Sequence, residues 1–356
     1  MLFNMEHDTG DRLAGYLVPD SFRDHAVISV RVSGREVLRV PTFERRDSLR
    51  QAGRHETGLC GYTLDDRHVQ DLAGVADLAV HDAATGLMVA RRVDEAEVIG
   101  LRLIRLETHL LPLVALDRAL APAFRYGYAG LDRYSGETVS QVLLINDGGS
   151  LYASGRMTYR SVQGSLEPHA AGVIVLRDPV LELAERLLVL NRIGVAQVPL
   201  FGERDRLIWA PAVSFAAGLD FRDLYALRRA LASVPARAAA LLANPVTRIL
   251  AAGAPEEAVR SRHVPAALRA LSRFTLVGLR ERWDEFREDV AALTGRGAED
   301  IPVIETVGAV EQLAAEIRGL RAVNALLAVD LELYAHVRDA FEADRAPPMA
   351  MGEHAA

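Results

Sequence analysis

Lysine is absent from this sequence. All 41 residues in its combined lysine and arginine count are arginine. The absence excludes a Schiff-base lysine, a lysine general base and a phosphate loop that depends on lysine. We attribute it to mutational bias toward arginine and alanine, and the chemical consequence holds whatever its cause.

Cysteine, a basic excess and long apolar runs are also lacking. Cys60 is the single cysteine, so no intrachain disulfide can form. The formal net charge is −7, which argues against nonspecific binding to nucleic acid or to an anionic membrane. No stretch approaches the roughly 18 apolar residues of a membrane-spanning helix. Since MLFNMEHDTG also lacks the basic and apolar regions of an export signal, we expect a cytoplasmic protein.

The residues that are present can build a sizeable core. Of the 356 residues, 50% are hydrophobic and 25% are charged, which excludes global disorder and suggests two domains. Apolar alternation over 26–32 and 36–40, around the turn Ser33-Gly34, predicts a β-hairpin. We therefore predict a small β-sandwich over 11–95, with a linker near 92–100.

Helical spacing replaces strand spacing from about residue 99, with apolar residues recurring from Leu101 to Leu116. Two apolar runs, 141–145 and 172–176, are typical of buried parallel strands that lead into helices. The chain from 180 to 345 is mostly helical in pattern. The predicted fold class is α/β: the sandwich, an α/β domain over 99–345 with a parallel sheet and a helical C-terminal part, and a disordered tail over 346–356.

The segment Arg177-Asp178-Pro179 follows one of these predicted strands. Asp178 suits a helix N-cap and Pro179 suits the first helical position, so both are explained structurally. An arginine at the carboxyl end of a buried strand suits a phosphate ligand, with a purely structural role as the alternative. We expect its guanidinium to point into a cleft, within reach of Ser150 or Arg156.

The turn after 141–145 contains Gly148, Gly149 and Ser150, whose backbone N–H groups could hold a phosphate. An ordinary strand-to-helix turn is the alternative, because the Walker spacing is absent. His169 precedes Arg177 by eight residues and could reach the same edge, or be a lone surface histidine. Isolated histidines and one cysteine give no metal signature.

Four segments together resemble carbohydrate sulfotransferases that use PAPS (3′-phosphoadenosine 5′-phosphosulfate), a family with a P-loop fold. The segments are Leu176-Arg177-Asp178-Pro179, Ala243–Leu250, Phe274–Trp283 and Val329–Tyr334. Residues 11–95 are similar to β modules beside bacterial glycan-modifying transferases, so the chain resembles a divergent bacterial member with an N-terminal β module.

The resemblance implies a P-loop-like sulfotransferase domain and a set of roles for PAPS as co-substrate, with no metal. In it, Gly148, Gly149 and Ser150 would hold the phosphosulfate. Arg177 would hold the 3′-phosphate, assisted by Arg186. His169 would be the base, and Arg156 would stabilise the sulfuryl group.

Two departures weaken the implied activity. The family's phosphate loop carries a lysine that this chain lacks. The family also places an arginine and a serine where this chain has Glu182 and Glu185, and two carboxylates repel a phosphate.

We therefore expect sulfuryl transfer from PAPS to a hydroxyl of a bacterial glycan or glycolipid precursor, and leave open whether the chain is an enzyme. The alternative is a catalytically inactive protein of sulfotransferase fold that binds a glycan or a partner. A glycosyltransferase that uses a nucleotide sugar is a third reading, without a D-x-D motif to support it. No nucleic-acid partner is expected, and the oligomeric state is open, a homo-oligomer included.

Overall fold

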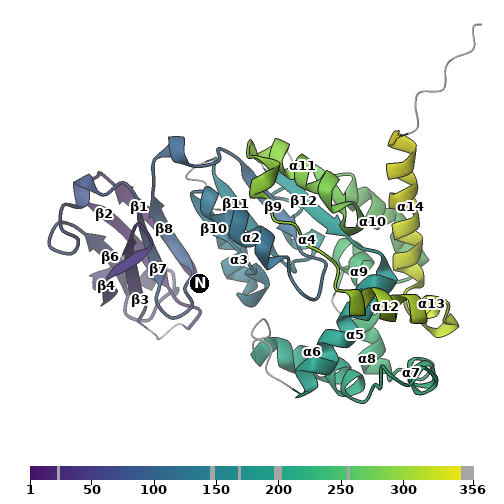
Figure 1. The fold of residues 1–356 in the computed structure, drawn as a ribbon. Helices are drawn as coiled ribbons and strands as arrows, with labels where there is room; N and C mark the ends of the chain where they lie inside the picture. Colours follow the sequence, from purple (N-terminus) through teal and green to yellow (C-terminus); the bar gives the residue numbers. More distant parts are fainter. Residues whose placement is uncertain (22–24, 145–148, 167–169, 196–202, 255–256, 346–356) are drawn as a thin grey trace, which may run out of the picture.

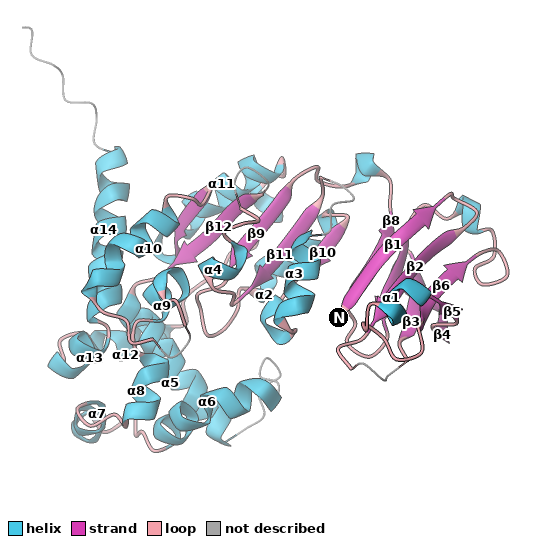
Figure 2. Cartoon of the chain, turned by 180° about the vertical axis from the view of Figure 1, so that it is seen from behind, coloured by secondary structure: helices cyan, strands magenta, loops and turns pink. Residues whose placement is uncertain are grey.

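The computed structural model describes residues 1–21, 25–144, 149–166, 170–195, 203–254 and 257–345. It has mixed α/β architecture, with antiparallel sheets at the N-terminus, then a parallel sheet and a largely helical C-terminal half (Figures 1 and 2). This confirms the predicted fold class at that level. Among the described helices, none has the length and apolarity that crossing a bilayer requires.

Two four-stranded antiparallel sheets form the N-terminal part. The first has the order β1 (Leu2–Asp8), β2 (Leu13–Val18), β6 (Leu59–Leu64), β5 (Glu44–Arg45), and the second the order β4 (Arg35–Pro41), β3 (Val27–Val32), β7 (Leu78–Asp82), β8 (Met88–Arg92). The predicted hairpin is present as β3 and β4. Its turn places Ser33 and Gly34 at φ 49° and 78°, a conformation that glycine adopts without strain.

The five strands of the third sheet are all parallel. Their order is β10 (Tyr126–Tyr128), β11 (Leu151–Gly155), β9 (Arg102–Leu106), β12 (Ala171–Leu176), β13 (Leu276–Leu279). Of these five strands, β9 comes first in the sequence and lies at the centre of the sheet, with later strands on both sides.

The helical pattern that we expected from Leu101 is wrong over β9. Arg105 lies inside this strand and interrupts its apolar run. The buried strand tolerates this charge because the guanidinium pairs with Glu107 at 2.8 Å and Asp117 at 2.7 Å. The expected strand over 141–145 is also wrong, since α3 (Gly136–Leu144) occupies its described part. A short apolar run does not distinguish a buried strand from a helix that buries one face.

Two groups of helices cover the faces of the parallel sheet. One face packs against α2 (Val114–Leu120) and α11 (Trp283–Thr294). The other packs against α3, α4 (Tyr159–Val162), α9 (Pro245–Ala251), α10 (Val264–Leu271) and α14 (Ala328–Arg345). A separate apolar core joins α5 (Pro179–Val195), α6 (Glu203–Ala217), α7 (Leu224–Leu231), α8 (Ala236–Leu242), α12 (Gly308–Ile317) and α13 (Arg321–Leu326).

The sandwich shares its apolar core with the second of these sheet faces. Tyr128 donates its hydroxyl hydrogen to the Met88 carbonyl at 3.0 Å, and the Gln141 amide donates to the Phe3 carbonyl at 2.8 Å. The first sheet also includes β1, which lies ahead of residue 11. The sandwich therefore packs on the α/β part through these contacts, in addition to the covalent connection near 92–100 where we predicted a linker.

Candidate functional site

The carboxyl edge of the parallel sheet gathers the charged residues of the candidate site. β9 and β12 are hydrogen-bonded neighbours, so the loop after β9 and the segment after β12 emerge side by side. The Asp178 carboxylate accepts the backbone N–H groups of Val180 at 2.9 Å and Leu181 at 3.1 Å, and α5 begins at Pro179. The predicted cap is thus confirmed, and it fixes the direction in which α5 leaves the edge.

Arg177 is enclosed by the protein, not aimed into an open cleft. It is 2% exposed, and its Nη1 lies 2.9 Å from Glu185 and 3.9 Å from Glu182. We expected it within reach of Ser150 or Arg156, and this is wrong for Ser150, which precedes β11 at the opposite edge of the sheet. The charge of Arg177 is thus paired with carboxylates one and two turns along α5, although its Nε and Nη1 make no hydrogen bond among the described residues.

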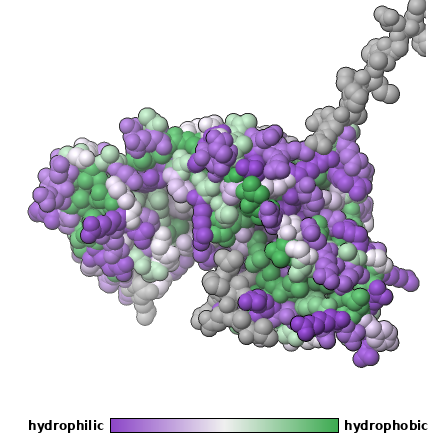
Figure 3. Space-filling view, in the orientation of Figure 1, coloured by the Kyte–Doolittle hydropathy of each residue, from purple (hydrophilic) through white to green (hydrophobic). Residues whose placement is uncertain are grey.

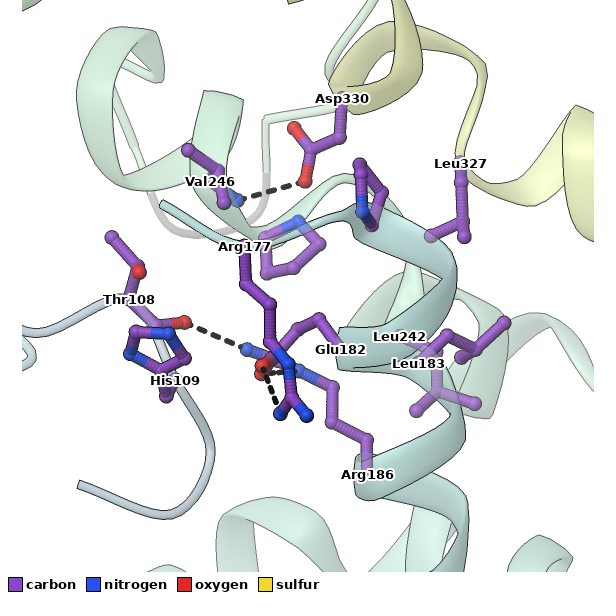
Figure 4. Close-up of a pocket in the computed structure, with 12 residues that line it drawn as sticks. Thr108, His109, Arg177, Glu182, Leu183, Arg186, Leu242, Val246, Leu327 and Asp330 are labelled. Carbon is purple, nitrogen blue, oxygen red and sulfur yellow. Dashed lines mark hydrogen bonds and ion pairs between the residues drawn. The ribbon is translucent and has the colours of Figure 1, made fainter. Parts of the chain in front are cut away.

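Glu182 lies beside the guanidinium groups of Arg177 and Arg186 (Figure 4). One carboxylate oxygen accepts the backbone N–H of Leu110 at 3.0 Å and Nε of Arg186 at 2.7 Å. Burial alone would raise the pKa of Glu182, but the nearby positive groups, Arg186 foremost, outweigh burial and hold it below its usual value. The carboxylate is therefore ionised and fills a site built for an anion.

The loop between β9 and α2 directs its backbone donors to the chain's own carboxylates. Glu107 accepts the N–H groups of His109 at 3.0 Å and Leu113 at 2.8 Å, while Leu110 donates to Glu182. A loop that binds phosphate leaves such N–H groups for the ligand. Residues 107–113 also contain no glycine, so backbone and sequence both differ from a phosphate cradle.

The cavity around Arg177 is too small for a nucleotide. Its free volume is about 10 Å³, and His109, Arg177, Glu182 and Arg186 are among its walls. That is room for about one water molecule. PAPS therefore does not fit the residues present at this inner cavity while both glutamates pair with Arg177.

A larger pocket of about 670 Å³ lies next to the inner cavity and shares Thr108, Arg186 and Pro245 with it. The charged residues in its described lining are four arginines and two aspartates: Asp132, Arg156, Arg186, Asp205, Arg237 and Arg248. We call this the outer pocket. The Arg186 guanidinium carbon lies 5.7 Å from the centre of the Trp209 ring, so this cation–π contact forms part of the wall between the two spaces.

The arginines of the outer pocket differ in their partners. Arg156 pairs with Asp132 at 3.0 Å and Asp205 at 3.4 Å. Arg248 donates to the Ala240 carbonyl at 2.8 Å, and burial lowers the pKa of its guanidinium. Arg237 is exposed. An anionic ligand would offset the burial of Arg248 and meet an exposed cation in Arg237.

The structure brings some of the residues that we selected from the sequence together and separates others. Arg156, Arg177 and Arg186 lie at the carboxyl edge, Arg177 at the inner cavity, Arg156 at the outer pocket and Arg186 at both. Gly149 and Ser150 precede β11 at the amino edge, where the Ser150 hydroxyl accepts the Arg125 N–H at 2.8 Å. They share no site with Arg177.

The remaining selected residues, Gly148 and His169, lie outside the described residues. Sequence reasoning missed Thr108, His109 and Trp209. Thr108 and His109 could have been selected, because residues just after a parallel strand lie at the carboxyl edge of the sheet, but we interpreted the segment of β9 as a helix. No local signal marked Trp209, which comes from another helix.

Two segments of the family resemblance meet in a structural contact. Asp330 accepts the N–H groups of Val246 at 3.0 Å and Thr247 at 2.8 Å, which caps α9. Asn244 accepts the N–H groups of Val329 and Asp330, both at 3.0 Å, which caps α14. These polar residues therefore tie two helices together by reciprocal capping.

The comparisons with known proteins give no family. No family model matches the chain, and no curated protein matches it.

Proposed function

We propose that this chain is a glycan-binding protein of sulfotransferase-like α/β architecture that does not transfer sulfuryl groups from PAPS. One observation supports the proposal most directly: Glu182 lines the inner cavity and pairs with Arg177 and Arg186, and Glu185 pairs with Arg177 from the next turn of α5. A phosphate there would have to displace two buried carboxylates that already hold the cations, at a large cost in free energy.

The outer pocket supplies the binding site of the proposal. Its volume of about 670 Å³ lies within the usual range for ligand pockets, and its arginines outnumber its aspartates by two. Guanidinium groups recognise carboxylates and sulfates through paired hydrogen bonds. The Trp209 indole offers a flat apolar face for a sugar ring. The ligand class that fits these groups is an acidic saccharide, one that carries a uronate or sulfate group.

PAPS-dependent sulfuryl transfer to a glycan is the second candidate function. The observation in its favour is His109, which is 1% exposed and whose Nε2 has no hydrogen-bond partner among the described residues. Glu107 holds the other ring nitrogen at 2.7 Å, an arrangement suited to a general base. This candidate requires Glu182 to leave the inner cavity and Glu185 to release Arg177.

A calorimetric titration separates the two candidates. We expect no saturable binding of PAP, the desulfated product of PAPS, up to millimolar concentration, and saturable binding of the disaccharide of glucuronic acid and N-acetylglucosamine. Replacing Arg237→Ala should weaken disaccharide binding about three- to tenfold through loss of a charge-assisted contact. Arg338→Ala, which removes an exposed arginine from α14, is the matched control and should have no effect. Saturable PAP binding would favour the enzyme instead.

A further inference from the structure

Two large apolar side chains are exposed beside the outer pocket. Leu207 and Ile208, neighbours on α6, are 79% and 49% exposed. Ile208 and the next residue, Trp209, also line the pocket. Figure 3 shows apolar surface gathered over the region of α5, α6 and α8. A single exposed leucine is ordinary, but an apolar rim that continues into a ligand pocket is not.

The charge of this region is opposite to that of the whole chain. Residues 203–242, which span α6, α7 and α8, contain six arginines and four acidic residues, whereas the chain carries a formal net charge of −7. The same segment holds four of the ten large exposed hydrophobic residues among the described part of the chain. At the outer pocket, cationic and apolar groups line one space, since Ile208 and Trp209 share it with four arginines. Such a combination matches an amphiphile with an anionic head.

We infer that the ligand of the outer pocket is lipid-linked: its acidic sugar head binds in the pocket, and its hydrocarbon chain lies against Leu207 and Ile208. The inference rests on the proposed function and adds the class of ligand. A hydrocarbon chain would remove these two side chains from water, a gain that a free saccharide cannot provide. The arginines would select an anionic head over a neutral one.

Vesicle co-sedimentation of the full chain tests the inference. The probes are phosphatidylcholine vesicles with about 20 mol% glucuronosyl diacylglycerol, the same vesicles with phosphatidylglycerol at equal charge, and phosphatidylcholine alone. We expect binding to the first, and binding at least about tenfold weaker to the other two. Leu207→Glu should abolish most of it. Val37→Glu, on the sandwich and 50% exposed in the native chain, is the matched control and should retain it.

Three results would overturn the inference. One is binding of the soluble disaccharide with none to any vesicle, which leaves the proposed function standing. The second is equal binding to phosphatidylglycerol vesicles, which reduces the effect to surface charge. The third is vesicle binding that Leu207→Glu leaves unchanged while circular dichroism shows a folded variant. Failure to bind both the disaccharide and the vesicles would instead reject the proposed function.

Discussion

Replacing Glu182→Ala should turn the inner cavity into a binding site for a small inorganic anion. The carboxylate now accepts the Leu110 N–H and Arg186 Nε, with Arg177 3.9 Å away. Its removal leaves the Leu110 N–H and the Arg186 Nε without their carboxylate, while Arg177 keeps its partner Glu185 at 2.9 Å. Breaking a buried ion pair by removing one partner costs about 3–5 kcal/mol, so we expect a loss of that size in the free energy of unfolding.

Sulfate or phosphate should restore much of that loss, because each can take the place of the missing carboxylate. An anion present at about 100 times its dissociation constant stabilises the folded state by about 2.7 kcal/mol. The assay is urea denaturation at several sulfate concentrations, with chloride keeping the ionic strength constant. Sulfate also strengthens apolar burial in any protein, so the informative quantity is the difference between variant and wild type.

Glu185→Ala is the matched control for this experiment. Glu185 pairs with Arg177 at 2.9 Å, and no backbone N–H donates to it among the described hydrogen bonds. Its removal should destabilise the protein with little sulfate-specific rescue. If sulfate stabilised wild type and Glu182→Ala equally, the idea that Glu182 occupies an anion site would be refuted.

Three further predictions concern stability, each measured by urea denaturation. Asp330→Ala should lower the free energy of unfolding by about 2–3 kcal/mol through loss of the α9 cap, whereas the exposed Asp339→Ala on α14 should change it by less than about 0.5 kcal/mol. Because the pKa of Glu182 is lowered on folding, its contribution is complete above the unfolded value of 4.5 and is lost as pH falls below it; Glu182→Gln should flatten this acid limb, and an unchanged limb would contradict the assignment. Burial and two nearby arginines lower the pKa of His81 to about 4, so the unfolded chain takes up a proton first and stability should fall from pH 6.5 to 4; His81→Gln should remove that slope, and a slope that persists would assign it to other groups.

Local sequence signals predicted the parts of the fold whose causes are local. Ser33-Gly34 marked a hairpin turn, and Asp178-Pro179 marked a helix start, because turn and cap preferences depend on adjacent residues. The order of strands was not predictable in this way. The central strand β9 was missed because Arg105 interrupts its apolar pattern. The carboxylates of Glu107 and Asp117, which pair with Arg105, are brought to it only by folding.

The candidate site was predictable only in part, for the same reason. The resemblance aligned Glu182 and Glu185 with the family's phosphate-site positions, and the structure has both paired with Arg177, which we had expected in an open cleft. The Leu110 N–H that fixes Glu182 comes from a loop 72 positions away, and no spacing rule could supply it. Trp209 and three arginines of the outer pocket come from four separate helices, and Arg156 comes from the segment after β11, so only the folded chain brings them together.

A crystal structure of the protein grown with both PAP and the acidic disaccharide tests the central claim most directly. We predict the disaccharide in the outer pocket, in contact with Arg237 and Arg248, while Glu182 keeps its bonds to Leu110 and Arg186 and no nucleotide is present at the inner cavity. A 3′-phosphate bound to Arg177, with Glu182 and Glu185 turned away, would contradict the account.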